Sequence, residues 1–285
     1  MKYSVTLLLI SIIILSCGDD DGIVASFIPI DATEAVLAAE LDLPNGDGPF
    51  PAMIMVHGSG HVDRHLFKGS AQNYVRLGIA VLRYDKRGVG QSTGRYHDVN
   101  AANSPTVFPI LADDVNSIVK YLTTRPDILP DHIGLIGPSQ AGWIMPLAAG
   151  SSSDISFMVS VSGATSTVGI SDYFDSIAEG NMTEEEIAEA LKNFNGIHGF
   201  DPRPSLESLQ IPALWVYGGK DKSNPAANDI SIIEDIRETY DKDYTVHLFP
   251  NLNHELLDVN TNAPIPETQI CVNDWLELKL GLSEN

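Results

Sequence analysis

The sequence predicts a doubly wound α/β fold, in which a mostly parallel sheet carries helices on both of its faces. Six short apolar runs, each bounded by Gly, Pro or Asn, have the length and composition of buried parallel strands. Helical patterns lie between them, and this alternation of strand and helix implies the fold. The runs are residues 52–56, 79–84, 132–136, 157–161, 213–217 and 244–249.

Amphipathic spacing defines two of the intervening helices. In residues 112–124 apolar side chains recur at positions i, i+3, i+4 and i+7, which places them on one helical face. Residues 231–240 carry a similar stripe of isoleucines. Ahead of the first buried run, residues 23–30 and 35–43 have the pattern of an N-terminal hairpin. Ligands of such sheets bind beyond the carboxyl ends of the strands, so we expect the functional residues there.

Residues 164–209 interrupt the alternation. This segment contains Thr183 followed by three glutamates, which is a capped helix start with acidic side chains in its first turn. An insertion at this point would lie over the carboxyl edge of the sheet as a small lid, and the alternative is a long connection that packs elsewhere. We expect one domain over residues 23–285, with this insertion as its lid.

The first 22 residues have the pattern of a bacterial lipoprotein leader. An apolar run over residues 5–15 is too short to span a bilayer and leads into Ser16-Cys17. Residues 1–16 are therefore predicted to be a signal peptide and Cys17 the site of lipid attachment, with a simple secretory signal as the alternative. Residues 17–22 would be the lipidated cysteine and an acidic tether.

This leader predicts an outer-membrane lipoprotein of the bacterial cell envelope, held at the membrane by its lipid anchor. The acidic run after Cys17 resembles the surface-export signals of Bacteroidetes lipoproteins, and a solvated spacer is the alternative. A surface-exposed position is therefore one of two expected placements.

Composition excludes several classes of function. The net charge of −21 repels nucleic acid, so we expect no nucleic-acid partner. No Cys or His spacing is typical of a metal site and no glycine-rich phosphate loop is present, so we predict no metal and no cofactor. Cys271, the only cysteine besides Cys17, is predicted to be a small buried apolar residue on a helix.

The segment Gly137-Pro138-Ser139-Gln140-Ala141-Gly142 follows an apolar run and precedes a helix-forming stretch. A serine on a sharp strand-to-helix turn between small residues is the arrangement of a nucleophile elbow. The turn would expose the hydroxyl of Ser139 and point the N–H of Gln140 toward an oxyanion beside it. Taken alone, the segment also fits an ordinary strand–helix turn.

An acid and a base follow the serine, each at the end of a predicted strand. Asp221 lies 82 residues after Ser139, and His254 lies 33 residues after Asp221. His254 is the candidate base, because a neutral imidazole suits proton transfer near pH 7. Asp221 is the candidate acid that orients the imidazole, and Asp258 is its main rival.

The loop His57-Gly58-Ser59-Gly60 follows the first buried run, and its glycines let the backbone bend close to the serine turn. The N–H of Ser59 is the best candidate for a second oxyanion donor, with Gly60 as the next choice. His57 is expected to be structural, with hydrogen bonds inside its own loop.

Together these motifs resemble the α/β-hydrolase family, in the branch that combines esterases with prolyl-oligopeptidase-like enzymes. The resemblance spans about residues 30–280 and implies the α/β-hydrolase fold and its Ser-Asp-His triad, but it does not specify a substrate. In this family the loop after Tyr84 shapes the rim of the site, so Asp85 and Arg87 are expected to form local hydrogen bonds. The motifs are residues 57–60, 84–92, 133–143, 218–221 and 253–254.

Two residues depart from the family pattern, and a proline lies in the helix after the elbow. Ala141 replaces the usual second glycine of the elbow and is small enough for that position. Pro138 stands before the serine, where histidine is frequent, and should alter only the pocket wall. Pro146 is expected to kink the helix that follows the elbow.

The expected activity is that of a serine hydrolase that cleaves small carboxylic esters through an acyl-enzyme intermediate and needs no cofactor. Ser139 would attack the carbonyl, His254 would take its proton and Asp221 would hold the imidazole. The N–H groups of Gln140 and Ser59 would bind the oxyanion. A peptidase or acyltransferase with the same triad is the alternative, although the sequence contains no propeller-like domain to select peptides. A non-catalytic surface binding protein is disfavoured, because a binder needs no triad.

Overall fold

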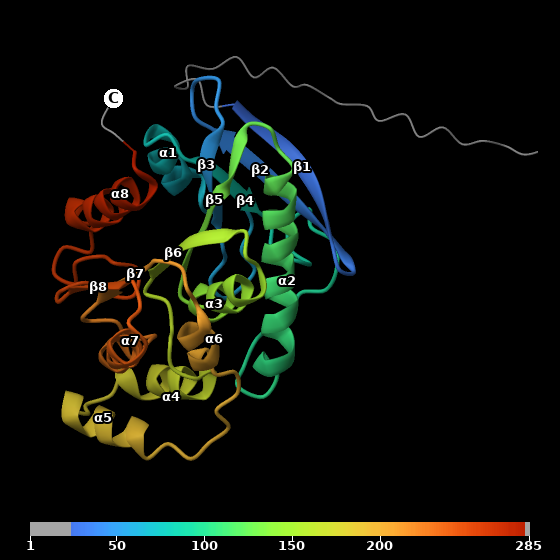
Figure 1. Cartoon of the computed structure of the whole chain (residues 1–285). Coiled ribbons are helices and arrows are strands. Elements are labelled where there is room, and N and C mark those ends of the chain that lie inside the picture. The colour runs from blue at the N-terminus through green and yellow to red at the C-terminus, as the bar shows by residue number, and fades with distance from the viewer. Residues whose placement is uncertain (1–23, 283–285) are drawn as a thin grey trace, which may run out of the picture.

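The structure, a computed structural model, describes residues 24–282 and is organised around one eight-stranded sheet (Figure 1). The strand order is β1-β2-β4-β3-β5-β6-β7-β8. β1 and β2 form an antiparallel hairpin, β2 pairs antiparallel with β4, and every other pair of neighbours is parallel. The predicted fold class is confirmed, and the six apolar runs are the six parallel strands. The strands are β1 (Val24–Ala32), β2 (Ala35–Leu43), β3 (Phe50–Met55), β4 (Ala80–Tyr84), β5 (Ile128–Pro138), β6 (Ile155–Val161), β7 (Ala213–Gly218) and β8 (Tyr244–Phe249).

Helices cover both faces of the sheet. Side chains alternate along β3, so that Ala52 and Ile54 join one core cluster while Met53 and Met55 join the other. The first cluster includes α2, α3, α6 and α7, and the second includes α1 and α8. Burial on both faces explains why the strands are continuous apolar runs. The helices are α1 (Lys68–Arg76), α2 (Ser104–Thr123), α3 (Ala141–Ser151), α6 (Arg203–Ser208), α7 (Ala226–Tyr240) and α8 (Pro266–Leu280).

Prolines make the extent of two of these helices hard to predict from the sequence. α2 begins at Ser104, ahead of the expected start at residue 112, because Pro105 occupies the first turn, where a missing N–H costs nothing. The buried side chains of Val107 and Phe108 continue its apolar face upstream. α3 runs to Ser151 as one helix even though Pro146 lies inside it.

The segment 164–209 forms three helices, and they do not share one position. α4 (Val168–Ala178) packs against α5 (Glu184–Lys192), and Figure 1 shows this pair beyond the end of the sheet, below α3 and α7. α5 starts with the predicted cap, a reciprocal pair of bonds between Thr183 and Glu186. α6 instead packs on α3 and α7, so only the α4–α5 pair occupies the place expected of a lid.

The predicted signal peptide, Cys17 and the tether lie outside the described residues. Within residues 24–282, none of the helices combines the length and the hydropathy needed to cross a bilayer. Cys271 lies on α8 and is half-buried against the second core cluster. Burial raises the pKa of its thiol, and Asp274 acts in the same direction.

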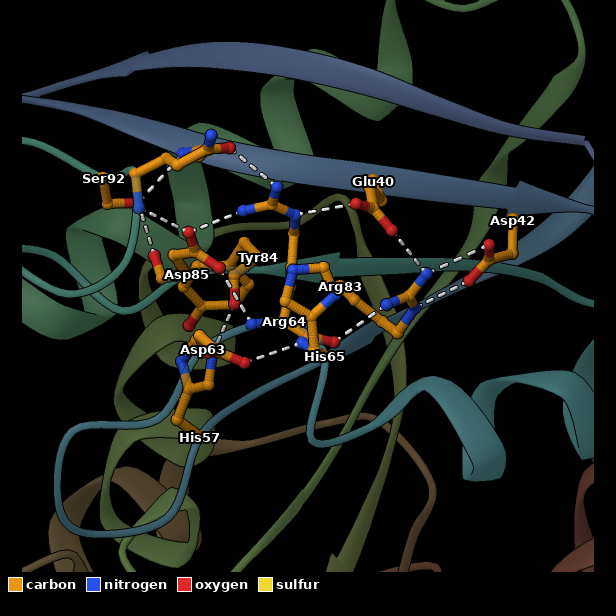
Figure 2. Close-up of polar contacts among 12 residues, drawn as sticks. Glu40, Asp42, His57, Asp63, Arg64, His65, Arg83, Tyr84, Asp85 and Ser92 are labelled. Atoms are coloured by element: carbon orange, nitrogen blue, oxygen red, sulfur yellow. Dashed lines mark hydrogen bonds and ion pairs between the residues drawn. The ribbon is translucent and has the colours of Figure 1, made fainter. Parts of the chain in front are cut away.

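A buried network of charges fixes the connection between β3 and α1 (Figure 2). Arg64, in this connection, donates to Glu40 on β2 at 2.9 Å and to Asp85 after β4 at 2.6 Å. Arg83 on β4 is fully buried and donates to Asp42 at 2.7 Å, to Glu40 at 2.9 Å and to the carbonyl oxygen of Arg64 at 2.8 Å. Because every carboxylate faces a guanidinium, the cost of burying these charges is compensated.

Replacement of Arg83 should destabilise the fold, because it removes the positive charge that compensates the buried carboxylates. Arg83→Met leaves Asp42 and Glu40 without their shared guanidinium, so we expect the free energy of unfolding to fall by about 3–5 kcal/mol in urea titrations. Arg203→Met is the matched control, since Arg203 pairs with Glu207 and Asp235 at a more exposed position. The control should lose less than about 1 kcal/mol, and equal losses in both variants would contradict the assignment.

Candidate active site

Ser139 sits on a strained turn between β5 and α3. Its φ of 54° is left-handed, which is rare for a residue with a side chain. The turn is held on both sides, because the N–H of Ser139 donates to the carbonyl oxygen of Val161 and its own carbonyl accepts from Gly142. Gly137 is required below the turn, since a Cβ there would lie 2.5 Å from the carbonyl oxygen of Val56 and from the Cβ of Ala141. The local geometry is that of a nucleophile elbow.

The structure brings Asp221, after β7, and His254, after β8, into direct contact. Oδ2 of Asp221 lies 2.8 Å from Nδ1 of His254. The other oxygen, Oδ1, accepts hydrogen bonds from the backbone N–H groups of Ser223 and Asn224, each at 2.8 Å. Both oxygens of this buried carboxylate therefore have hydrogen-bond partners, which fix its orientation. Asp258, the rival acid, is partly exposed, and within residues 24–282 its carboxylate accepts bonds only from its own turn, at residues 260 and 261.

Asp221 also controls the charge of His254. Burial alone would lower the pKa of His254, but the hydrogen bond and the negative charge of Asp221 outweigh it, so the pKa lies above its ordinary value. The Nδ1 proton points at the carboxylate, which leaves Nε2 as the nitrogen free to accept a proton. An imidazole in this state is a base held in one tautomer.

Two glycines let the acid and the base meet. A Cβ on Gly218 would lie 2.3 Å from the carbonyl oxygen of Asn253, directly before the histidine. A Cβ on Gly219 would lie 2.7 Å from the carbonyl oxygen of Pro250. The loop after β8 thus folds back over the end of β7, and the N–H of Lys220 donates to Leu252 in that loop. Any larger residue at Gly218 would separate Asp221 from His254.

Ser139 and His254 follow strands that end at the same edge of the sheet, but the described residues include no hydrogen bond between them. Such bonds are often long in unliganded sites and shorten when a substrate binds. Of the three predicted members, the structure therefore joins Asp221 to His254 directly and places Ser139 with them by topology.

The two predicted oxyanion donors lie on either side of the elbow. The N–H of Gln140 is at the start of α3, and the loop of residues 57–60 passes so close that a Cβ on Gly58 would be 3.6 Å from the Cβ of Ser139. In the described part of the chain, neither the N–H of Gln140 nor that of Ser59 donates to a protein acceptor. Both N–H groups therefore remain without a protein acceptor in residues 24–282.

His57 and Arg87 differ from expectation in their partners. His57 donates from Nε2 to the carbonyl oxygen of Tyr84 at 2.6 Å, so it ties its loop to β4 and does not bond within the loop. Burial, aided by the charge of Lys86, lowers the pKa of His57 to about 3, which keeps the ring neutral. Arg87 reaches Asp114 on α2, at 2.8 Å from Nε, so the expectation of local bonding was wrong for this residue.

Asp85 does bond locally, to the N–H of Gln91, but it also holds Arg64. Sequence reasoning missed Arg64 and Lys86, whose side chains organise the loops beside the elbow. The signal that could have found Lys86 was its place directly after a buried strand, inside the segment that carries the family resemblance.

A cavity of about 610 Å³ lies between the α4–α5 pair and the acid loop. Its wall is mainly apolar and includes Phe174, Met182, Ile187 and Leu191 from the insertion. Asp221 contributes to the lining from the opposite side, whereas Ser139 and His254 do not. The cavity therefore borders the acid of the pair and not its base.

The strand order, the strained serine after β5 and the acid–base pair after β7 and β8 define an α/β-hydrolase fold. Residues 65–281, well over half of the chain, match the model of the prolyl oligopeptidase family, and the chain belongs to this family.

Similar proteins include esterases and a peptidase. Esterase EstD of Thermotoga maritima is 28% identical over 225 residues, which are 69% of this chain and 52% of the esterase, so the chain spans about half the length of that relative. A Pyrococcus furiosus esterase superposes with a TM-score of 0.67 at 16% identity, covering 94% of this chain and 96% of the other. The acylaminoacyl peptidase of Pyrococcus horikoshii gives a TM-score of 0.69 at 17% identity, covering 92% and 43%. At these identities the two superpositions establish the fold.

Replacement of the acid should change the titration of the base. We expect Asp221→Asn to lower the pKa of His254, because the carboxylate charge is lost while burial, which also lowers this pKa, remains. The ring signals of His254, followed by NMR against pH, measure the shift. Asp258→Asn is the matched control and should leave the pKa unchanged; the reverse pattern would make Asp258 the acid.

The raised pKa of His254 also makes the free energy of unfolding depend on pH. Because the pKa of His254 is raised by folding, the stabilisation is fully present below the ordinary value of 6.5 and is lost as pH rises through the raised pKa. Asp221→Asn should remove this contribution on the acid side.

The backbone of Asn253 lies too close to Gly218 for any side chain at that position. Gly218→Ala forces the backbone apart and should lower the free energy of unfolding by about 1–3 kcal/mol, as overpacking does. Gly69→Ala on α1, where an added Cβ meets nothing within 4 Å, should be neutral or stabilising. Thermal unfolding of both variants measures the difference, and a stable Gly218→Ala protein would refute the packing argument.

Proposed function

We propose that this protein is a serine hydrolase that cleaves carboxylic esters through Ser139, His254 and Asp221. The observation that carries the proposal is the 2.8 Å contact between a buried Asp221 and His254, at the sheet edge where Ser139 occupies a strained turn. Two backbone N–H groups also bond to the other oxygen of Asp221 and fix the carboxylate in place. A histidine with only a structural role would not need an acid that is oriented in this way.

The reaction would proceed in two halves. Nε2 of His254 takes the proton of the Ser139 hydroxyl as Oγ bonds to the ester carbonyl carbon, and the carbonyl oxygen becomes an oxyanion. The N–H groups of Gln140 and Ser59 donate to this oxygen. When the tetrahedral intermediate collapses, His254 returns the proton to the leaving alcohol. Water then attacks the acyl-enzyme by the same route and releases the acid.

The α4–α5 pair would be the lid of this site. Two exposed ion pairs join it to the acid loop on either side of Asp221, Lys220 with Glu184 at 3.7 Å and Lys222 with Glu179 at 2.8 Å. The cavity beside Asp221 has an apolar wall that would suit the hydrocarbon part of an ester, although Ser139 and His254 do not line it.

Similar proteins favour an ester over a peptide. EstD is named as an esterase, and the Pyrococcus furiosus esterase matches this chain over nearly its whole length. The name of the family and the similarity to an acylaminoacyl peptidase keep a peptidase with the same triad as the second candidate.

The leader is the basis for a proposed cellular placement. We propose that Cys17 carries the lipid that anchors the protein at the outer membrane, with the acidic residues after it as the tether. The substrate would then be a small ester of the cell envelope or its surroundings.

Hydrolysis of p-nitrophenyl esters from acetate to laurate tests the activity. We expect turnover in the wild type and at least a 10³-fold loss, or about 4 kcal/mol of transition-state stabilisation, in Ser139→Ala. Ser117→Ala, on the surface of α2, is the matched control and should retain activity. Ester turnover that survives in Ser139→Ala would reject the mechanism, and cleavage of acyl-peptides but of no ester would favour the peptidase.

A further inference from the structure

Lys86 is a buried lysine beside the proposed oxyanion site. It follows β4 directly and is only 5% exposed. Its Nζ donates to the carbonyl oxygen of Gly58 at 2.7 Å and to Oε1 of Gln140 at 2.9 Å, and it lies 3.4 Å from the carbonyl oxygen of Gly60. One ammonium thus connects the two segments that carry the candidate oxyanion donors.

The charge on Lys86 is not neutralised by direct contact. Among residues 24–282 no carboxylate forms an ion pair with its Nζ, and all three of its oxygen contacts are to neutral groups. The ring of Tyr96 lies 5.9 Å away and is stacked on His61. Titratable groups that act on this region include His57, which is neutral, Asp85, whose carboxylate is paired with Arg64, and Asp98, which attracts the ammonium without a hydrogen bond to it. A positive potential therefore remains beside the elbow.

The hydrogen bond from Lys86 to the carbonyl oxygen of Gly58 also fixes the direction of the N–H of Ser59. The carbonyl of Gly58 and the N–H of Ser59 belong to one planar trans unit and point in opposite directions. When Nζ holds the oxygen, it fixes the direction of that N–H away from the lysine. A hydrogen bond at the oxygen also polarises the unit, so that the N–H of Ser59 becomes a stronger donor.

We propose that Lys86 is a positioning residue of the oxyanion hole, which aims and polarises the N–H of Ser59, anchors Gln140 and adds positive potential where the oxyanion forms. This inference rests on the proposed ester hydrolysis. It assigns to the lysine a part in stabilising the transition state, since the negative charge exists only there and in the tetrahedral intermediate.

The charge of Lys86 depends on pH in the working range. Burial lowers its pKa to about 8, against the weaker opposing effect of Asp98. As pH rises through about 8, the ammonium loses its proton and the positive potential disappears. Activity should therefore decline on the alkaline side with the titration of this group, while the titration of His254 sets the acid side.

The test compares Lys86→Met and Lys86→Arg with Lys242→Met in the full chain, with p-nitrophenyl acetate as substrate. Lys242 is the matched control because its Nζ also donates to a backbone carbonyl, that of Leu209 at 2.6 Å, far from the elbow. We expect kcat to fall about 10²-fold in Lys86→Met with KM nearly unchanged, as on loss of an oxyanion donor. Lys242→Met should keep the wild-type kcat.

The pH profile separates this role from a structural one. Lys86→Arg retains a charge at every accessible pH, so its alkaline decline near pH 8 should vanish, and Lys86→Met should lack it too. If Lys86→Met does not fold, as judged by circular dichroism, the profile of Lys86→Arg decides. An alkaline decline that persists in Lys86→Arg, or a Lys86→Met protein with wild-type kcat, would overturn the inference.

Failure of the proposed function looks different. If the wild type hydrolyses no ester, or hydrolyses it equally well as Ser139→Ala, the triad proposal fails and takes the role of Lys86 with it. If Ser139→Ala is inactive while Lys86→Met is as active as Lys242→Met, only the role of Lys86 is rejected.

Discussion

The site depends on backbone segments that approach each other more closely than any side chain allows. Below the elbow, Gly137 lies against the carbonyl of Val56, and at the other end of the site Gly218 lies against Asn253. These contacts seat the ends of separate strands side by side at one edge of the sheet. The loops that follow them can then meet without long side chains to bridge the gap, so the acid and the base are joined by one short hydrogen bond.

Buried charge is the second organising element, and it acts on the loops more than on the core. Arg64 and Arg83 bind carboxylates from β2 and from the end of β4, and they fix the connection between β3 and α1. Arg87 ties the loop after β4 to α2. Lys86 differs from these arginines, since its direct partners are neutral oxygens of Gly58, Gly60 and Gln140. Within residues 24–282, the three arginines each have a carboxylate partner, and Lys86 has none.

Membership of the prolyl oligopeptidase family fits this construction, in which a rigid sheet presents residues from several loops. The helices of the insertion between β6 and β7 lie in two different places. α6 belongs to the helical layer on the sheet, whereas α4 and α5 enclose the cavity behind the acid loop. α4 is held to the core by the buried side chain of Val168 and by a hydrogen bond from Ser171 to Asn224, whereas two exposed ion pairs join Glu179 and Glu184 to the acid loop.

The sequence by itself determined the parallel sheet, the turn at Ser139, the capped start of α5 and the strand ends that carry Asp221 and His254. These features are encoded locally, in apolar runs, small residues and caps a few positions apart. The tertiary structure alone decided that Asp221 and not Asp258 meets His254, that Arg87 pairs with Asp114, and that Lys86 faces Gln140. Such pairs join residues far apart in the chain, and their choice depends on strand order and close approach, which no local pattern records.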